Sequence, residues 1–113
     1  LVTFNVAGNY AVRVKLQAGR TGASGVSILL SRILLAGAQY CSPAATKVVS
    51  ADVTIPIESR VVINATAGQT FAVQIMRDSA GSNFGGIYPQ AATVTAWGTA
   101  PSGLLVISRL EPL

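Results

Sequence analysis

The chain has 113 residues, a length typical of one domain with a single hydrophobic core. Half of the residues are hydrophobic and 11% are charged, whereas soluble proteins average roughly 25% charged residues. So little charge excludes the usual charged surface of a monomeric protein. The sequence therefore predicts an exterior of small uncharged residues, an oligomer that hides part of its surface, or both.

The charged and titratable residues argue against nucleic-acid binding and against histidine-dependent catalysis or metal binding. Eight Lys and Arg against four Asp and Glu give a net charge of +4. The basic residues are scattered, and we expect them on strand exteriors and loops rather than in a stripe that follows a phosphate backbone. No nucleic-acid partner is predicted. Histidine is absent, so the commonest general base and metal ligand is missing.

Cys41 is the only cysteine, cannot form a disulfide within the chain, and is expected to be a small buried hydrophobic residue. The most apolar window, residues 26–38, is interrupted by Ser31-Arg32 and is shorter than the ~20 residues of a transmembrane helix, so no membrane insertion is predicted. No signal peptide opens the chain, and its first residues, LVTF, read like the interior of a protein. We therefore expect a piece of a longer chain.

Alternating apolar and polar residues predict strands in the first third of the chain. Residues 2–6 form a short β-prone run. A flexible Gly-rich loop is expected over residues 18–25. Residues 26–35 would also suit a helical stripe, but no helix cap precedes them, and we predict a strand that bends near Ser31-Arg32. The clearest alternation covers residues 10–17, where one face carries Tyr10, Val12, Val14 and Leu16.

The middle of the chain predicts a loop and three strands. The loop covers residues 36–46, and a strand follows over residues 47–57. Because proline cannot donate to a ladder, Pro56 places that end at a sheet edge or a bulge. Two sequential strands occupy residues 60–77 around a tight turn, whose conformation Gly68 adopts more readily than other residues.

The last third predicts an irregular stretch over residues 78–90, a strand over 91–97, a turn over 98–102 and a final strand over 103–110. This final strand is apolar on both faces and is therefore expected at the centre of a sheet. About eight strands joined by short turns, with no convincing helix, predict a single all-β domain, an antiparallel jelly-roll β-sandwich over residues 1–113.

In their order and spacing, four stretches resemble the jelly-roll heads of the tumour necrosis factor and complement globular-head family. They are Phe4 followed by Gly8, Tyr10 and an alternating strand; Ala67-Gly68-Gln69-Thr70-Phe71; Asn83-Phe84-Gly85-Gly86; and Ser102-Gly103-Leu104-Leu105-Val106. The chain has Gln69 where the family usually has Asp, and Leu104 in place of an aromatic residue. The family's first strand, expected before Val2, is missing or abbreviated.

The resemblance implies a compact homotrimer that binds a receptor or ligand. Similar modules cap the trimeric spikes and tail fibres of bacteriophages. The chain lacks the paired cysteines of animal members and is rich in Gly, Ala, Ser and Thr, which favours the viral version. We therefore expect a non-enzymatic head domain on a virion that serves trimer assembly and the binding of a host receptor or glycan.

No catalytic or cofactor site is predicted. The four acidic residues, Asp52, Glu58, Asp78 and Glu111, share no motif, and serines without a histidine form no triad. A weak calcium site would need Asp78 together with neutral oxygens from Ser79, Ser82 and Asn83. A polar turn with local hydrogen bonds explains these residues better, so no metal is predicted.

Residues in loops and at strand ends are the predicted ligand-binding set. Aromatic side chains there can stack on sugars or form interfaces, and an arginine in a Gly-rich loop could reach an anionic sugar. The set comprises Arg20, Tyr40, Asn83, Tyr88 and Trp97. The alternative for Trp97 is a core position at the end of the sandwich, and the alternative for Tyr88 is packing within its loop.

The strand that follows Gly68 has two faces. Phe71, Val73 and Ile75 lie on one, and Ala72, Gln74 and Met76 on the other. If one face fills the core, the other is a candidate trimer interface, because Met and Gln suit a self-complementary contact. We assign this role to Ala72, Gln74 and Met76, with an ordinary exposed face as the alternative.

Three other functions compete with the trimeric head. An extracellular lectin-like or cytokine-like module would be favoured by a disulfide or a glycan. A fragment of a carbohydrate-active enzyme would need two carboxylates ~5–10 Å apart in a groove. A structural capsid or decoration jelly roll would assemble into larger lattices without a soluble ligand.

Overall fold

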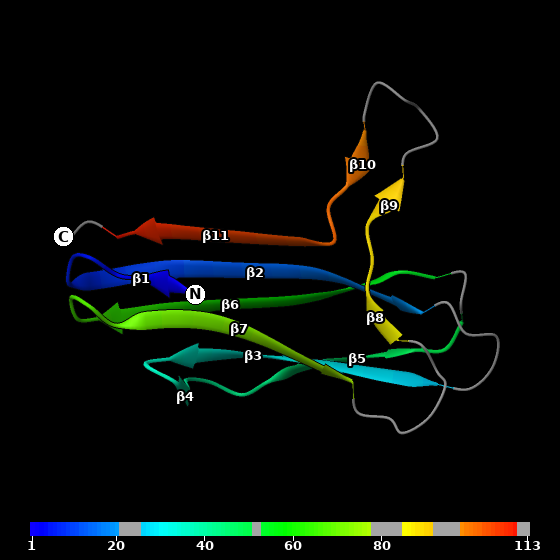
Figure 1. Cartoon of the computed structure of the whole chain (residues 1–113), viewed down its shortest axis with the longest axis horizontal. Coiled ribbons are helices and arrows are strands. Elements are labelled where there is room, and N and C mark those ends of the chain that lie inside the picture. The colour runs from blue at the N-terminus through cyan, green and yellow to red at the C-terminus, as the bar shows by residue number, and fades with distance from the viewer. Residues whose placement is uncertain (21–25, 51–52, 78–84, 92–97, 111–113) are drawn as a thin grey trace.

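The computed structural model describes the whole chain except residues 21–25, 51–52, 78–84, 92–97 and 111–113. The described residues form strands and turns and no helix (Figure 1). Among them, no helix is long and apolar enough to cross a membrane. The strands are β1 (Val2–Thr3), β2 (Gly8–Arg20), β3 (Ser27–Leu35), β4 (Ala38–Gln39), β5 (Ala44–Val48), β6 (Ile55–Ala65), β7 (Thr70–Arg77), β8 (Gly85–Ile87), β9 (Gln90–Ala91), β10 (Thr99–Ala100) and β11 (Gly103–Arg109).

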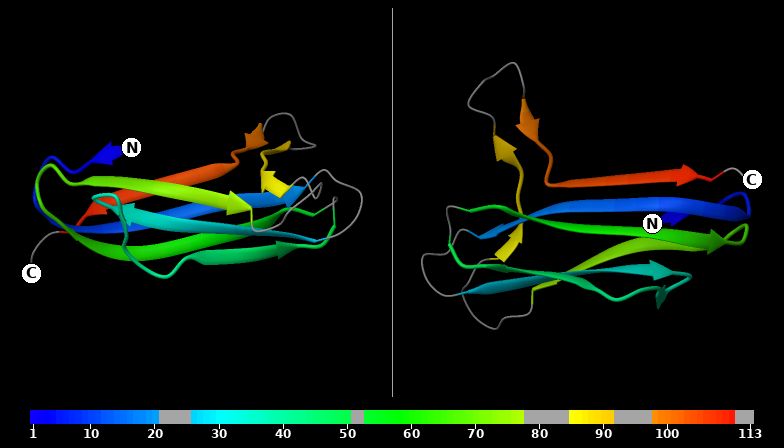
Figure 2. Two further views of the ribbon diagram at one scale, coloured as in Figure 1. Left: turned by 60° about the horizontal axis from the view of Figure 1, so that its bottom comes forward. Right: turned by 180° about the vertical axis from the view of Figure 1, so that it is seen from behind.

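Two antiparallel sheets pack face to face as an open sandwich (Figure 2). Sheet A has the order β1-β7-β3, with β4 and β5 both pairing to the far edge of β3. Sheet B has the order β11-β2-β6, and β8 pairs with the end of β2. Strands β9 and β10 pair with each other and form an arm that extends from the sandwich (Figure 1).

The strand order is that of a jelly roll with one position unfilled. A jelly roll has eight strands in two sheets. Here the last strand, β11, pairs with β2 along one edge, and no described strand pairs with its other edge. The orders β1-β7-β3-β5 and β11-β2-β6 occupy the remaining positions. The predicted antiparallel jelly-roll sandwich is therefore confirmed.

The core lies between the two sheets and follows the alternation of their strands. The predicted face of β2 points inward, with Val12 and Val14 only 2% and 3% exposed. Phe71 faces inward from sheet A, as predicted for its side of β7. The buried apolar side chains form one cluster: Phe4, Val12, Val14, Leu16, Ala18, Leu29, Ile33, Val48, Ile57, Ile63, Ala65 and Phe71.

Phe4 closes the sandwich at the turn between β6 and β7. Its backbone N–H donates to Gln69 O at 2.9 Å, and its carbonyl accepts from Gly68 N at 2.8 Å. Its ring lies 4.6 Å from the ring of Tyr10 and 6.3 Å from that of Phe71. Gly68 has a φ of +88°, as the predicted tight turn requires. The turn carries the chain from sheet B to sheet A.

The two long sides of the sandwich differ. On one side the Tyr40 hydroxyl, just after β4, donates to Val62 O of β6 at 3.1 Å and links the two sheets. On the other side, β11 faces β1 and β7 across an apolar groove of about 320 Å³. We call this second side the open side.

Several predicted strand boundaries were wrong. The predicted loop over residues 18–25 starts too early, because residues 18–20 continue β2 and pair with β8. The predicted strand over residues 47–57 is two strands, since β5 ends at Val48 and β6 begins at Ile55. The alternating pattern runs through both, but the chain passes from sheet A to sheet B between them. Pro56 lies in β6, at an edge of sheet B, as expected.

Short strands also occupy segments predicted to be irregular. The segment over residues 36–46 contains β4 and the start of β5, residues 78–90 contain β8, and residues 98–102 contain β10. Most of the predicted strand over residues 91–97 lies outside the described residues. The ladder between β3 and β7 runs without a break through Ser31-Arg32, where a bend was expected.

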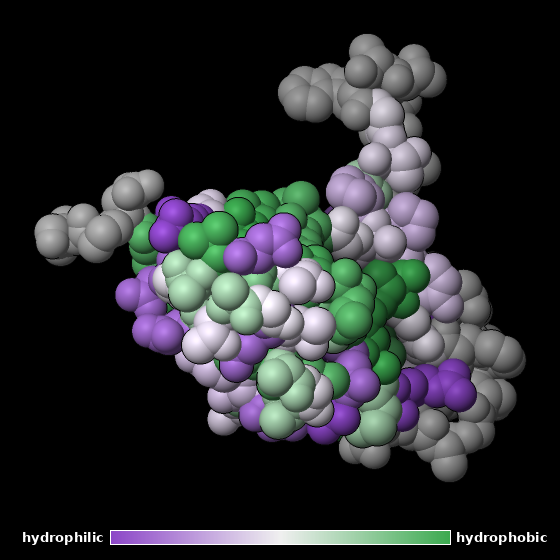
Figure 3. Space-filling model, turned by 60° about the vertical axis from the view of Figure 1, so that its left-hand side comes forward, coloured by the Kyte–Doolittle hydropathy of each residue, from purple (hydrophilic) through white to green (hydrophobic). Residues whose placement is uncertain are grey.

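The most informative correction concerns β11. Its apolar pattern predicts a central strand, but β11 lies at an edge of sheet B. Leu104, Leu105 and Val106 are 45%, 41% and 42% exposed, although they point alternately to opposite faces. Hydrophobic surface is visible along the upper edge of the body, where β11 lies (Figure 3).

Cys41 is half-buried and packs against the core cluster.

Candidate functional site

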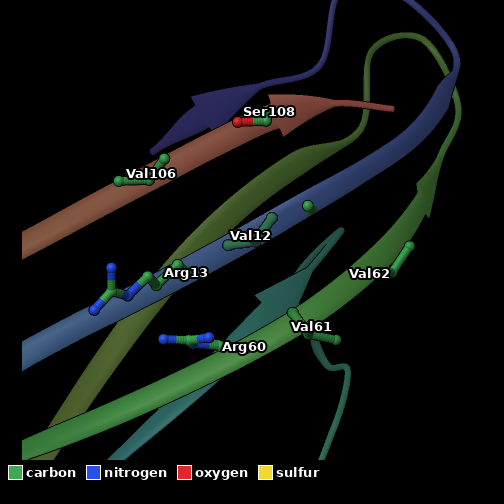
Figure 4. A pocket seen from close by; sticks show the side chains of 8 residues that line it. Val12, Arg13, Arg60, Val61, Val62, Val106 and Ser108 are labelled. Atoms are coloured by element: carbon green, nitrogen blue, oxygen red, sulfur yellow. The ribbon is translucent and has the colours of Figure 1, made fainter. Parts of the chain in front are cut away.

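A groove of about 430 Å³ crosses the outer face of sheet B, which is directed away from the core (Figure 4). Its floor is apolar and includes Ala11, Val62 and Val106. The ladders fix this arrangement, because they place Ala11 between Val62 of β6 and Ser108 of β11. Val62 is 55% exposed, so the floor is accessible to a ligand.

Two arginines border this groove side by side. Arg13 of β2 and Arg60 of β6 are direct partners in the ladder, so their like charges would repel (Figure 4). Glu58 lies two residues before Arg60 on the same face. Glu58 Oε1 accepts from Arg13 Nε at 3.0 Å and from Arg60 Nε at 2.7 Å. The hydrogen bond from Arg60, and then the one from Arg13, lowers the pKa of Glu58 below its ordinary value of 4.5.

The cluster retains one net positive charge and free donors. Both bonds to Glu58 use Nε, and the terminal amino groups of Arg13 and Arg60 donate to no described residue. A guanidinium suits a carboxylate because its donors match the two oxygens. The arrangement can therefore bind an anion next to an apolar surface. Within the described part of the chain, no group of three His, Cys, Asp or Glu residues could hold a metal ion.

Sequence reasoning placed these arginines on strand exteriors but did not bring them together. The spacing of Glu58 and Arg60 does show that they share one face of a strand. The position of Arg13 beside them depends on the register between β2 and β6, which no local pattern encodes. The cluster was therefore missed.

Two of the predicted ligand-binding residues lie at the same end of the sandwich. Arg20 ends β2, is only 5% exposed, and donates from Nη2 to Val49 O at 2.8 Å. Tyr88 follows β8, the strand that pairs with this end of β2. Its half-buried ring covers Gly19, where an added Cβ would lie 3.0 Å from Tyr88 Cδ2.

Of the other predicted ligand-binding residues, the structure describes only Tyr40, and it lies elsewhere. Tyr40 follows β4, which lies at the opposite end of sheet A from β8 (Figure 1). Its hydroxyl is bonded to the backbone of β6. Asn83 and Trp97 lie outside the described residues. The ligand-binding role of this set remains a prediction.

The predicted trimer residues Ala72, Gln74 and Met76 share the outer face of sheet A. Arg32 Nε donates to Gln74 Oε1 at 2.7 Å, and Met76 is 60% exposed opposite Leu30. Gln74 and Met76 line a hollow of about 530 Å³ together with Leu30, Arg32, Gln39, Pro43 and Ile75. Its lining combines apolar surface with hydrogen-bonded amide groups, as a self-complementary contact needs.

The fold and these surfaces define the class of protein as an all-β antiparallel sandwich. No family model matches the chain, and searches of curated proteins and of solved structures give no match.

Proposed function

We propose that this chain is a non-enzymatic jelly-roll head that assembles as a homotrimer at the tip of a viral spike or tail fibre. The resemblance to the tumour necrosis factor and complement heads, together with a jelly-roll order of strands, supports this proposal. In a virion, such a head would serve both trimer assembly and attachment to the host surface.

One observation carries the assembly part of the proposal. Thirteen large hydrophobic residues are exposed among the described residues, in a chain with only 11% charged residues. Larger exposed apolar patches mark interaction sites in soluble proteins. The outer face of sheet A, with Met76 and Gln74 around its hollow, is the surface that we assign to the trimer contact.

A matched pair of substitutions tests the trimer contact. Met76→Glu puts a charge on the outer face of sheet A, and Val62→Glu puts the same charge at a similarly exposed position, 60% against 55%, on sheet B. We expect Met76→Glu to yield monomers and Val62→Glu to keep the wild-type mass, as measured by light scattering on the eluting species. Equal masses for the two variants would refute the assignment.

A second part of the proposal assigns receptor binding to the groove on sheet B. The free donors of Arg13 and Arg60 beside an apolar floor suit a sugar that carries a carboxylate. We propose an acidic host-surface glycan as the ligand. This site differs from the ligand-binding set predicted from sequence.

An oligosaccharide of uronic acids tests this part. Arg60→Gln is expected to weaken its binding at least tenfold, and Lys47→Gln is the control because Lys47 carries the same charge at an exposed position on sheet A. The methyl ester of the oligosaccharide should not bind, since it lacks the carboxylate. Equal binding of ester and acid, or equal effects of the two variants, would overturn the assignment.

A further inference from the structure

We propose that the open side of the sandwich binds an extended, uncharged β-strand of a partner polypeptide, which joins sheet B along the free edge of β11. This proposal concerns a different surface from the trimer contact and the glycan site, and Ala72 borders both the trimer face and the open side. The trimer contact is assigned to the outer face of sheet A and the glycan to the outer face of sheet B, whereas the open side lies between the two sheets.

The groove on the open side is lined by apolar residues. β1, β2, β7 and β11 all contribute to its wall, and none of its lining residues is charged. They are Leu1, Val2, Val14, Leu16, Phe71, Ala72, Val73, Ile75, Gly103, Leu104 and Leu105. Leu105 is the ladder partner of Val14 and so points between the sheets, yet it is 41% exposed. The core is therefore uncovered along this side.

The backbone of β11 offers unused hydrogen-bonding groups along the same groove. Ser102 O accepts from Gln17 N at 2.8 Å, and Leu110 N donates to Asn9 O at 2.8 Å. Because bonding alternates along an antiparallel ladder, even-numbered residues of β11 bond to β2 and odd-numbered residues point outward. Leu105 and Ile107 thus direct their N–H and C=O groups to the free edge. An edge of this kind is a template for another strand.

The opposite wall of the groove is also incompletely paired. β1 pairs with β7 only at Thr70 and Phe71. Beyond Phe71, no described strand pairs with this edge of β7. The unfilled jelly-roll position beside β11 therefore coincides with a gap in the neighbouring edge of sheet A. Strand β11 is apolar on both faces over residues 104–107, and its one charged residue, Arg109, lies at its end.

The chemistry of the groove specifies its occupant. A strand that pairs with the seven residues of β11 would send every second side chain into the apolar groove. Those side chains must be apolar, because a charged group there would lose its hydration without gaining a partner. A second copy of this chain is the competing occupant, and the exchange experiment below distinguishes it from a partner strand.

A synthetic peptide tests the proposal on the full chain. The probe alternates valine with threonine over seven positions and carries a fluorophore and a short polyethylene glycol tail. The control peptide has the same composition, with its valines in one block. We expect saturable binding of the alternating peptide, measured by fluorescence anisotropy, and at least tenfold weaker binding of the control. Equal binding of the two peptides would overturn the proposal.

Two variants with matched exposure locate the binding edge. Leu105→Glu places a carboxylate in the groove, and Val106→Glu places one on the outer face of sheet B, at 41% and 42% exposure. We expect Leu105→Glu to weaken peptide binding at least tenfold and Val106→Glu to leave it within twofold of wild type. Circular dichroism checks that both variants are folded, and equal losses in two folded variants would contradict the proposal.

Amide hydrogen exchange supplies a readout that non-specific adhesion would not change. In the free chain, the amides of Leu104 and Val106 should exchange slowly and those of Leu105 and Ile107 quickly. The peptide should slow exchange at Leu105 and Ile107 at least tenfold. A different result is that these two amides are protected without peptide and lose that protection on dilution. It would show that a second copy of the chain is the occupant, and it would overturn the assignment to a partner strand.

Discussion

At the scale of single residues, Glu58 allows two arginines to lie opposite each other on sheet B. Its carboxylate bonds to both guanidinium groups, and its pKa is lowered mainly by the hydrogen bond from Arg60. A group whose pKa is lowered on folding stabilises the protein above its unfolded pKa. This stabilisation is lost as the pH falls through the lower pKa of the folded state.

We predict that Glu58→Gln reduces the loss of stability of the protein on acidification. The wild type should lose stability relative to the variant as the pH falls below 4.5, the ordinary value for Glu58. Because the cluster is exposed, the difference should be small and should shrink at high salt. Thermal unfolding across this pH range, at low and high salt, measures it. Parallel profiles for the two proteins at low salt would contradict the role given to Glu58.

At the scale of elements, β8 packs so closely on β3 that it requires a glycine. A Cβ at Gly85 would overlap Ser27 Oγ and lie 2.8 Å from Ser27 Cβ. Ser27 is fully buried, and its hydroxyl has no partner among the described residues. The Ser27 side chain and the backbone of β3 therefore cannot move away from an added Cβ at low cost. In contrast, the nearest atom to a Cβ at Gly86 is Tyr88 Cε2 at 3.4 Å.

We predict that Gly85→Ala lowers the free energy of unfolding by about 1–3 kcal/mol, the usual cost of overpacking a core. Gly86→Ala, in the same strand, should have a clearly smaller effect, because it meets only an ordinary contact. Chemical denaturation of the two variants beside wild type measures both. A cost for Gly86→Ala that equals or exceeds the cost for Gly85→Ala would show that β8 does not pack on β3 in this way.

The elements also show what the sequence can and cannot predict about this fold. Alternation on β2 and β7 correctly predicts which side chains face the core, because a strand has only two faces. The place of a strand within a sheet is different, because it depends on partners that are distant in sequence. Strand β11 has the apolar pattern of a central strand and lies at an edge, a mismatch that only the pairing reveals.

The candidate site on sheet B was beyond prediction for the same reason. Arg13 and Arg60 are far apart in sequence, and only the register between β2 and β6 makes them neighbours. Loop position and residue type led instead to Arg20, which the structure buries at the end of β2. A Gly-rich segment can still form a strand when a partner strand lies beside it. Here β8 is that partner for the end of β2.

At the scale of the whole molecule, the scarcity of charge is accompanied by exposed hydrophobic side chains on several surfaces. The two outer faces and the open side carry different chemistry: an apolar and amide hollow on sheet A, an arginine-bordered groove on sheet B, and an uncharged groove between the sheets. We propose a separate partner for each, namely further copies of the chain, an acidic glycan and an extended strand. A separate experiment tests each proposed partner.

The most direct test of the central proposal is the mass of the wild-type chain by sedimentation equilibrium over a range of micromolar concentrations. We predict one species of three 11.6 kDa chains, or about 35 kDa, as expected for closed cyclic symmetry. A stable monomer across the whole range would contradict it. The exposed face of Met76 and Gln74 would then not be a contact between copies, and the resemblance to trimeric heads would be limited to the pattern of strands.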